Sequence, residues 1–240
     1  MEHRDRLWPG GYTFLYDDGL FRPSTDTFLL GSFPRLRRGM TVCELGAGTG
    51  LLSLLLLARE PELTVTGVEL QPQACALFRR TAEENGLQGR MHYLEGDLRQ
   101  GLLPPGRFQL AVANPPYFPP DAGAVAPDAA RRTARAETDC TLAQLCAAAA
   151  RALTWGGSFC LVHRPDRLAD VLEELRRVRL EPKRLRFVHH TAAARPSLFL
   201  LEARLGGGVG LTVEPPLLLH GPDGGETEDV RRAYFRDKEE

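Results

Sequence analysis

Lysine and a net basic charge are the two features that this sequence most clearly lacks. Lysine occurs only at Lys183 and Lys238, so arginine supplies nearly all of the positive charge. The net charge is −1 at pH 7, which gives no overall signal for nucleic-acid binding. Any contact with a nucleic acid would therefore depend on local groups of arginines and not on the charge of the whole chain.

Paired cysteines and long apolar runs are also absent. The five cysteines are scattered, with no C-x-x-C pair and no Cys/His cluster at zinc spacing, so we expect reduced thiols and no metal site. The most apolar run, residues 53–58, is far shorter than the roughly 18 residues that a membrane helix needs. The first residues carry charges and no apolar core, so no signal peptide is visible. We therefore expect a cytoplasmic protein without a membrane segment; the sequence makes no prediction of its oligomeric state.

From residue 41 onwards, apolar segments of strand length alternate with segments of helix length. The apolar content of 43% is enough for a sheet that is covered on both faces. Such alternation is typical of an α/β fold, here a doubly wound, mostly parallel sheet with right-handed crossovers. The expected strands are 41–45, 63–70, 91–95, 108–113, 158–162, 185–189 and 197–204, and the expected helices are 50–59, 72–85, 141–153 (ended by 154–157) and 167–177.

The two ends of the chain have a different pattern. Strands at 12–16 and 20–22 around an Asp-Gly pair predict a hairpin, and Ser24 is expected to cap a helix that runs to about residue 36. Near the other end, glycines at 206–208 predict a hinge, glycines at 221–225 a turn, and the charged residues from about 226 a helix. We divide the chain into an N-terminal hairpin and capping helix at 1–40, a main domain at 41–205, and a C-terminal tail with a hairpin and short helix at 206–240.

A glycine-rich stretch, ELGAGTG at residues 44–50, follows the first expected strand of the main domain. Glycines at this point let a ligand approach the backbone and let the next helix pack close to the strand. A dinucleotide fingerprint, G-x-G-x-x-G, would need glycine at position 51, where this chain has Leu51. No G-K-[ST] follows either, so the pattern argues against NAD, FAD and an ATP-binding P-loop.

Acidic residues follow the second and third expected strands. Glu69 ends the second strand about twenty residues after the glycines, where a carboxylate can accept both ribose hydroxyls of a nucleoside. Gly96-Asp97-Leu98 follows the third strand, and Asp97 can accept a hydrogen bond from an adenine amino group. Each residue alone also fits ordinary turn chemistry, but their order after three successive strands predicts a nucleoside cofactor.

The most informative stretch is N-P-P-Y at residues 114–117, which follows the strand expected at 108–113. Two prolines cannot extend that strand, so Asn114 should lie at the carboxyl edge of the sheet, where α/β folds keep their sites. Asn114 Oδ1 and the Pro115 carbonyl can accept the two hydrogens of a flat NH2 group, and the Tyr117 ring can cover its face. The stretch therefore predicts an amine or amide substrate.

Taken in series, these motifs resemble those of the Rossmann-like S-adenosylmethionine-dependent methyltransferases. The resemblance covers about residues 22–204 and implies the class I fold of that superfamily, a seven-stranded sheet that ends in an antiparallel hairpin. It implies S-adenosylmethionine as the cofactor and an exocyclic NH2 group as the methyl acceptor. The implied cofactor contacts are Thr27, Glu44, Gly46, Gly48, Glu69, Asp97, Leu98 and Asn114, and the implied catalytic residues are Asn114, Pro115 and Tyr117.

The flanks resemble a narrower family. Residues 21–30 are similar to the segment that closes over the methionine end of the cofactor, and 135–137 resemble an A-R-x-E element. The tail at 215–235 looks like that of bacterial tRNA adenine-N6-methyltransferases acting beside the anticodon of a valine tRNA. The resemblance implies tRNA as the partner, with substrate contacts from Tyr117, Phe118, Arg131, Arg132 and Arg135. A sulfonium methyl group is already activated, so no catalytic histidine is expected, and His163, His189 and His190 are interpreted as strand or surface residues.

Two alternatives stay open. A protein glutamine presents the same NH2 group, so the chain also resembles glutamine N5-methyltransferases. A subunit that binds the cofactor or presents RNA without activity is the second alternative. The arginines at 131–135, together with the basic residues between 183 and 204, form either a rim for phosphates or solvated helix faces.

Overall fold

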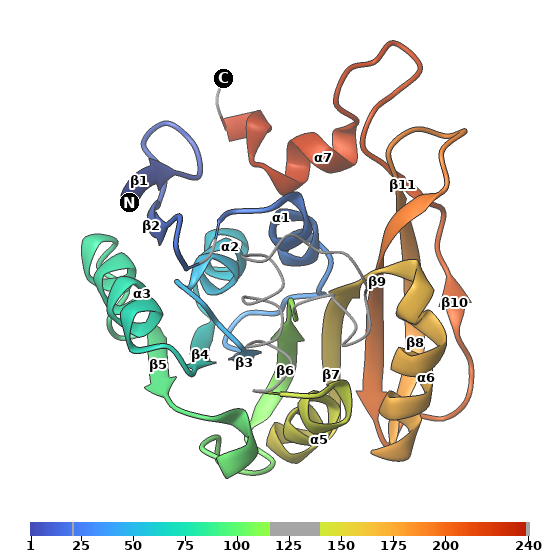
Figure 1. The fold of residues 1–240 in the computed structure, drawn as a ribbon, viewed down its shortest axis with the longest axis horizontal. Coiled ribbons are helices and arrows are strands. Elements are labelled where there is room, and N and C mark those ends of the chain that lie inside the picture. Colours follow the sequence, from blue (N-terminus) through green and yellow to red (C-terminus); the bar gives the residue numbers. More distant parts are fainter. Residues whose placement is uncertain (21, 116–139, 239–240) are drawn as a thin grey trace.

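A nine-stranded, mostly parallel sheet forms the centre of the protein (Figure 1). The computed structural model describes residues 1–20, 22–115 and 140–238. The strand order is β10-β8-β9-β7-β6-β3-β4-β5, with β11 also paired to β8, and β9 is antiparallel to both of its neighbours. The strands are β3 Thr41–Leu45, β4 Thr64–Glu69, β5 Met91–Glu95, β6 Phe108–Ala113, β7 Leu153–His163, β8 Leu180–His189, β9 Pro196–Leu205, β10 Thr212–Val213 and β11 Leu217–Leu218.

Helices cover both faces of this sheet, as the doubly wound prediction requires (Figure 1). Alternate residues of each strand face opposite sides: Val42 and Val112 pack with α1, α2 and α3, while Cys43 and Ala113 pack with α5 and α6. The helices are α1 Thr25–Ser32, α2 Leu51–Arg59, α3 Pro72–Glu84, α5 Leu142–Ala152, α6 Leu168–Arg177 and α7 Glu228–Ala233, and the 3-10 turns are η1 Leu98–Gln100, η2 Pro165–Arg167 and η3 Arg236–Lys238.

The predicted α/β fold is confirmed, and two very short strands extend it. The strands from β3 to β9 are the seven that the sequence predicted, including the closing antiparallel pair β8–β9. β10 and β11 contain two residues each and pair in parallel with β8. Segments of that length carry no alternation of apolar and polar residues, so the sequence pattern could not reveal them.

The N-terminal hairpin is real, but its predicted pairing is wrong. β2 (Thr13–Asp17) pairs with β1 (Glu2–Arg6) and not with residues 20–22, of which Phe21 lies outside the described residues. β1 is polar throughout and mostly exposed, so it gives no strand signal. Ion pairs attach it to α3: Arg80 binds Glu2 at 2.7 Å, and Arg4 binds Glu84 at 2.9 Å.

Prolines account for two further differences from the predicted elements. The first helix stops at Ser32 and not near residue 36. Phe33 still has helical backbone angles, but Pro34 has no N–H with which to continue the helical hydrogen bonds. β8 starts at Leu180, five residues before the predicted strand, since a register shift between Pro182 and Arg184 accommodates the proline. A third difference does not involve proline: β7 starts at Leu153, five residues before the predicted strand. Residues 154–157, predicted to end a helix, therefore belong to a strand.

The chain ends pack onto the same core as the sheet. Leu7 and Phe14 from the N-terminal hairpin, and Val230 and Phe235 from the last segment, are buried in the cluster that α1 and α2 form with one face of the sheet. α7 lies directly against α1 (Figure 1). This packing places α1 between the sheet and the C-terminal helix.

Replacing Gly50 by alanine should lower the free energy of unfolding by about 2–4 kcal/mol. Gly50 has φ +86°, and an added Cβ would lie 2.6 Å from Phe78 Cδ2 and 2.7 Å from Met91 Cε. Gly86 is the matched control, because its φ is +66° but no atom lies within 4 Å of an added Cβ. Gly86→Ala should therefore cost only about 1 kcal/mol. Urea denaturation measures both, and equal losses would contradict the steric argument.

Candidate active site

A cavity of about 990 Å³ opens at the carboxyl edge of the parallel strands. It is bounded by the loops that follow β3, β4, β5 and β6, and by the start of α1. The predicted site residues that line it are Thr27, Glu44, Gly46, Gly48, Glu69, Asp97, Leu98, Asn114 and Pro115. The structure therefore brings together, in one cavity, residues that are up to 88 positions apart in the sequence (115 minus 27). A smaller cavity of about 410 Å³, between η1 and α5, shares Val68 and Leu98 with it.

The glycine loop after β3 is held by backbone hydrogen bonds. Gly46 and Gly48 have φ of +73° and +52°, a region that favours glycine. The N–H groups of Gly46 and Ala47 donate to the Val68 carbonyl at 3.0 and 2.9 Å. The loop thus turns sharply at the end of the strand and lines the cavity with backbone, which suits the close approach of a nucleoside.

Glu44 lies beneath this loop and caps α2. Its Oε2 accepts hydrogen bonds from both the N–H, at 2.9 Å, and the hydroxyl of Ser53. Burial raises the pKa of Glu44 to about 8, although the Ser53 hydrogen bonds act in the opposite direction. Gly50, which precedes the helix, has no side chain to cap it, so Glu44 supplies the acceptor from the neighbouring strand. Glu44 was predicted as a cofactor contact; it lines the cavity, and its hydrogen bonds to Ser53 serve the helix.

Glu69 connects the loops that follow β3 and β4. Its Oε2 accepts the Gly48 N–H at 2.8 Å, and its Oε1 accepts the Gln71 N–H at 2.9 Å. A carboxylate has about four acceptor positions, so these two bonds leave capacity for ribose hydroxyls. The side chain is buried at 8% exposure but lines the cavity, which fits the predicted role in binding a nucleoside.

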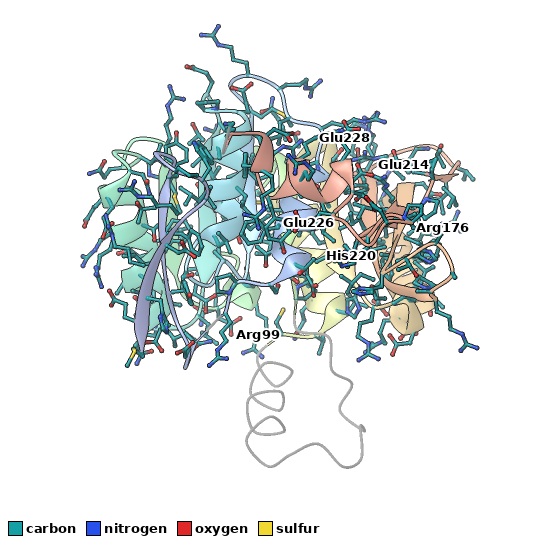
Figure 2. The ribbon with its side chains drawn as sticks, turned by 90° about the horizontal axis from the view of Figure 1, so that it is seen from above. Arg99, Arg176, Glu214, His220, Glu226 and Glu228 are labelled. Carbon is teal, nitrogen blue, oxygen red and sulfur yellow. The ribbon has the colours of Figure 1, made fainter. Side chains whose placement is uncertain are left out.

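Asp97 is engaged with a partner that the sequence did not suggest. It caps η1 by accepting the Arg99 N–H at 2.8 Å, and it forms an ion pair with the Arg99 guanidinium at 2.6 Å. These hydrogen bonds hold the pKa of Asp97 below its ordinary value. Figure 2 shows Arg99 on the opposite side of the molecule from Glu214 and Glu228. An adenine amino group at Asp97 would share its carboxylate with Arg99.

Asn114 lies directly after β6, as predicted, and its amide group is oriented by α1. Its Nδ2 donates to the Thr27 hydroxyl at 2.9 Å. Thr27 is only 2% exposed, and Ser24 Oγ lies 3.2 Å from the Thr27 hydroxyl oxygen. With the amide nitrogen committed to Thr27, Oδ1 is the atom of Asn114 that suits an incoming NH2 group. Thr27 was predicted to contact the cofactor, but its hydrogen bond to Asn114 was not predicted.

His163 lines the cavity, which sequence reasoning did not predict. It is a strand residue, as interpreted, because it ends β7 next to β6, but it is only 4% exposed. Burial, with the nearby charge of Arg167, lowers the pKa of His163 to about 4. Its Nδ1 accepts the Arg164 N–H at 2.8 Å, so the neutral ring carries its proton on Nε2. Its position at the carboxyl end of a strand adjacent to N-P-P-Y was the signal available in the sequence.

The basic residues between 183 and 204 are largely occupied by structural contacts. Arg184 is buried against Glu202 at 2.9 Å, and Arg186 pairs with Asp229 at 2.6 Å. Lys183 donates to the Gly208 carbonyl at 2.8 Å. These contacts occupy all three side chains within the fold, so they do not support the alternative of a rim for phosphates at these residues.

Several predicted substrate contacts lie outside the described residues. They are Tyr117, Phe118, Arg131, Arg132 and Arg135. In residues 1–20, 22–115 and 140–238, no group of three or more His, Cys, Asp or Glu side chains is arranged to hold a metal ion. Of the helices that the structure describes, none has the length and apolar character needed to cross a membrane.

The sheet order, the glycine loop and the carboxylates at the strand ends define an S-adenosylmethionine-dependent methyltransferase of class I. The sequence model of the methyltransferase small domain matches residues 21–181, and the chain belongs to this family. Both findings confirm the fold and the cofactor expected from the sequence.

Relatives and solved structures agree with this assignment. A Yersinia enterocolitica protein named tRNA1(Val) (adenine(37)-N6)-methyltransferase is 31% identical over 182 residues, which cover 73% of this chain and 71% of the relative. A Yersinia pestis (strain Pestoides F) protein of the same name is 32% identical over 160 residues, and the match spans 64% of each chain.

Two solved structures share the fold. One, described as a predicted O-methyltransferase, protein Atu636, from Agrobacterium tumefaciens, has a TM-score of 0.72 and 21% identity, and the match covers 87% of this chain and 96% of that one. The other, a precorrin-6y C5,15-methyltransferase from Geobacter metallireducens GS-15, has a TM-score of 0.54 and 17% identity, with coverages of 79% and 93%.

The stability of the protein should fall as the pH rises from 6.5 to 8, because of Glu44. The pKa of Glu44 rises from 4.5 in the unfolded chain to about 8 in the folded protein. The contribution of Glu44 to the free energy of unfolding is therefore complete below pH 4.5, and it falls as the pH rises toward and past about 8. His163 acts in the opposite direction near pH 6.5, where part of the unfolded-state imidazole is still protonated, so the comparison with Glu44→Gln is what isolates Glu44. We expect a loss of about 1–2 kcal/mol in the free energy of unfolding. Urea denaturation at several pH values should show a flatter profile for Glu44→Gln, and an unchanged slope would exclude Glu44 as the source.

Proposed function

We propose that this methyltransferase transfers a methyl group to the exocyclic amino group of an adenine in tRNA. The observation that carries the proposal is the Asn114 carboxamide, which is fixed at the end of β6 in the same cavity as Glu69 and Asp97. The names of the relatives at 31–32% identity support tRNA as the substrate. An enzyme with this substrate works in the cytoplasm, where its tRNA is found.

The residues of the cavity suit S-adenosylmethionine. Glu69 offers acceptor positions for the ribose hydroxyls, and the loop at Gly46 and Gly48 brings backbone close to the ligand. The cofactor supplies a methyl group that is already activated by its bond to a sulfonium. The protein therefore has to align the acceptor, and positioning of this kind can contribute several kcal/mol to lowering the barrier.

Asn114 and Pro115 would align the acceptor amine. The amine of adenine is a poor nucleophile because its lone pair is delocalised into the ring. Asn114 Oδ1 and the Pro115 carbonyl oxygen accept its two hydrogens, which favours a pyramidal nitrogen with its lone pair directed at the methyl group. These hydrogen bonds strengthen as positive charge develops on the nitrogen, so they stabilise the transition state more than the ground state.

A protein glutamine is the second candidate acceptor, and one observation favours it. Asp170, Glu173 and Glu174 of α6 line the same cavity, and acidic side chains are poor neighbours for RNA phosphates. Two arginines offset this charge: Arg167 pairs with Asp170 at 2.7 Å, and Arg177 pairs with both glutamates. Because two of the three negative charges are offset in this way, and because the relatives are named tRNA adenine methyltransferases, we place adenine first.

Asn114→Ala should lower turnover by about 10²-fold while cofactor binding changes little, as expected for the loss of one positioned polar contact. Turnover is measured as transfer of tritium from labelled S-adenosylmethionine, and binding of S-adenosylhomocysteine by calorimetry. Retention of near-normal turnover would reject the role proposed for Asn114. Loss of turnover together with loss of S-adenosylhomocysteine binding would instead assign Asn114 to cofactor binding.

The acceptor itself is tested by offering the enzyme two substrates in parallel. Bulk tRNA and bulk protein from cells that lack the enzyme are incubated with tritiated cofactor, and the products are hydrolysed and separated. We expect label in N6-methyladenosine from the tRNA fraction. Label in methylglutamine would establish the second candidate, and label in neither fraction would support a protein that binds the cofactor without catalysis.

A further inference from the structure

The Asn114 carboxamide can adopt two orientations that differ by a half turn about its side-chain bond. In one orientation, Oδ1 faces the acceptor amine and can accept its hydrogen. In the other, the amide NH2 group faces the amine, and an amide nitrogen only donates, so it offers the hydrogens of the amine no acceptor. Methyl transfer by the proposed mechanism therefore needs a device that selects the first orientation.

The Thr27 hydroxyl is suited to this selection. It accepts the Asn114 Nδ2 hydrogen at 2.9 Å, and its oxygen lies 3.2 Å from Ser24 Oγ. A hydroxyl has a single hydrogen, and when that hydrogen is given to Ser24, Thr27 can offer Asn114 only an acceptor. An acceptor binds the NH2 side of the carboxamide and not its oxygen.

The position of Thr27 is itself fixed by packing on several sides. The helix that carries it, α1, packs on α2, where Gly31 leaves room for Leu55. On its other side, Phe28 stacks on Tyr234 with ring centroids 4.3 Å apart, and the Tyr234 hydroxyl donates to Thr25 at 3.1 Å. A buried hydroxyl on a helix held in this way has little freedom to follow a rotating carboxamide.

We propose that Thr27 is a positioning residue that, through a hydrogen-bond chain from Asn114 to Ser24, holds Asn114 Oδ1 toward the acceptor amine. This inference rests on the role proposed for Asn114. It differs from a direct contact between Thr27 and the cofactor, which the resemblance implied. The two roles affect different measurable quantities: a positioning residue changes kcat, whereas a cofactor contact changes the affinity for S-adenosylhomocysteine.

Thr27→Val is the central variant, because valine keeps the shape of threonine and removes the hydroxyl. We expect kcat for tritium transfer to the acceptor fraction to fall about 10- to 100-fold, as for a misplaced catalytic group. The calorimetric Kd for S-adenosylhomocysteine should stay within about threefold of wild type, since the transfer step is what the variant impairs. Thr27→Ser keeps the hydroxyl and should restore most of kcat.

Ser32→Ala is the matched control. Ser32 lies on the same helix, and its hydroxyl donates to the Leu29 carbonyl at 2.7 Å, within α1 itself. Its removal should leave kcat unchanged, so a fall in both variants would indicate general damage to α1 and overturn the inference. If Thr27→Val does not fold, Ser24→Ala provides the test, with an expected loss of about 2- to 10-fold in kcat for one hydrogen bond.

A double variant separates this inference from the proposed function. If Thr27 acts through Asn114, adding Thr27→Val to Asn114→Ala should cost little beyond Asn114→Ala alone. Independent, multiplying losses would overturn the inference, as would a weaker affinity for S-adenosylhomocysteine with unchanged kcat. Normal turnover by Asn114→Ala would refute the role proposed for Asn114, and label in methylglutamine in place of N6-methyladenosine would refute the proposed acceptor. A loss with Asn114→Ala but not with Thr27→Val would refute only the role of Thr27.

Discussion

The carboxylate of Glu69 is the interaction on which the rest of the site depends. It accepts the N–H of Gly48 from the loop after β3 and that of Gln71 at the start of α3, so it connects the ends of two adjacent strands. Gly46, Gly48 and Gly50 have no side chains with which to anchor the loop, and the neighbouring strand supplies the anchor. Glu44 has a similar role beneath the loop, where it caps α2 through Ser53. The cavity is therefore shaped before any ligand enters, which reduces the entropy lost on binding.

The two halves of the cavity are built on different principles. The cofactor half consists of strand ends and backbone, and its shape follows from the parallel sheet. The acceptor half depends on contacts between elements that are remote in sequence, since Asn114 of the sheet edge meets Thr27 of α1. α1 in turn depends on the stacking of Phe28 and Tyr234. The geometry of the acceptor side is thus a property of the whole tertiary structure.

The sequence predicted the central strands well because β3 and β6 are largely apolar and buried. β6 was predicted with its observed bounds, and β3 and β5 likewise. The polar strand β1, by contrast, is held by its pairing with β2 and by ion pairs to α3, and no periodic pattern marks it. The bond between Asn114 and Thr27, and the burial of His163, arise only when distant segments pack together. Spacing along the chain carries no information about such contacts.

The contact between α7 and α1 sets an order of events during translation. Residues 228–235 leave the ribosome after every strand of the sheet has been synthesised, and only then is the outer side of α1 covered by Tyr234 and Val230. Domains form progressively as the nascent chain lengthens, so the sheet and its glycine loop assemble first. The glycine loop and the strand ends that carry Glu69 and Asp97 can thus form before the outer side of α1 is covered by the C-terminal segment.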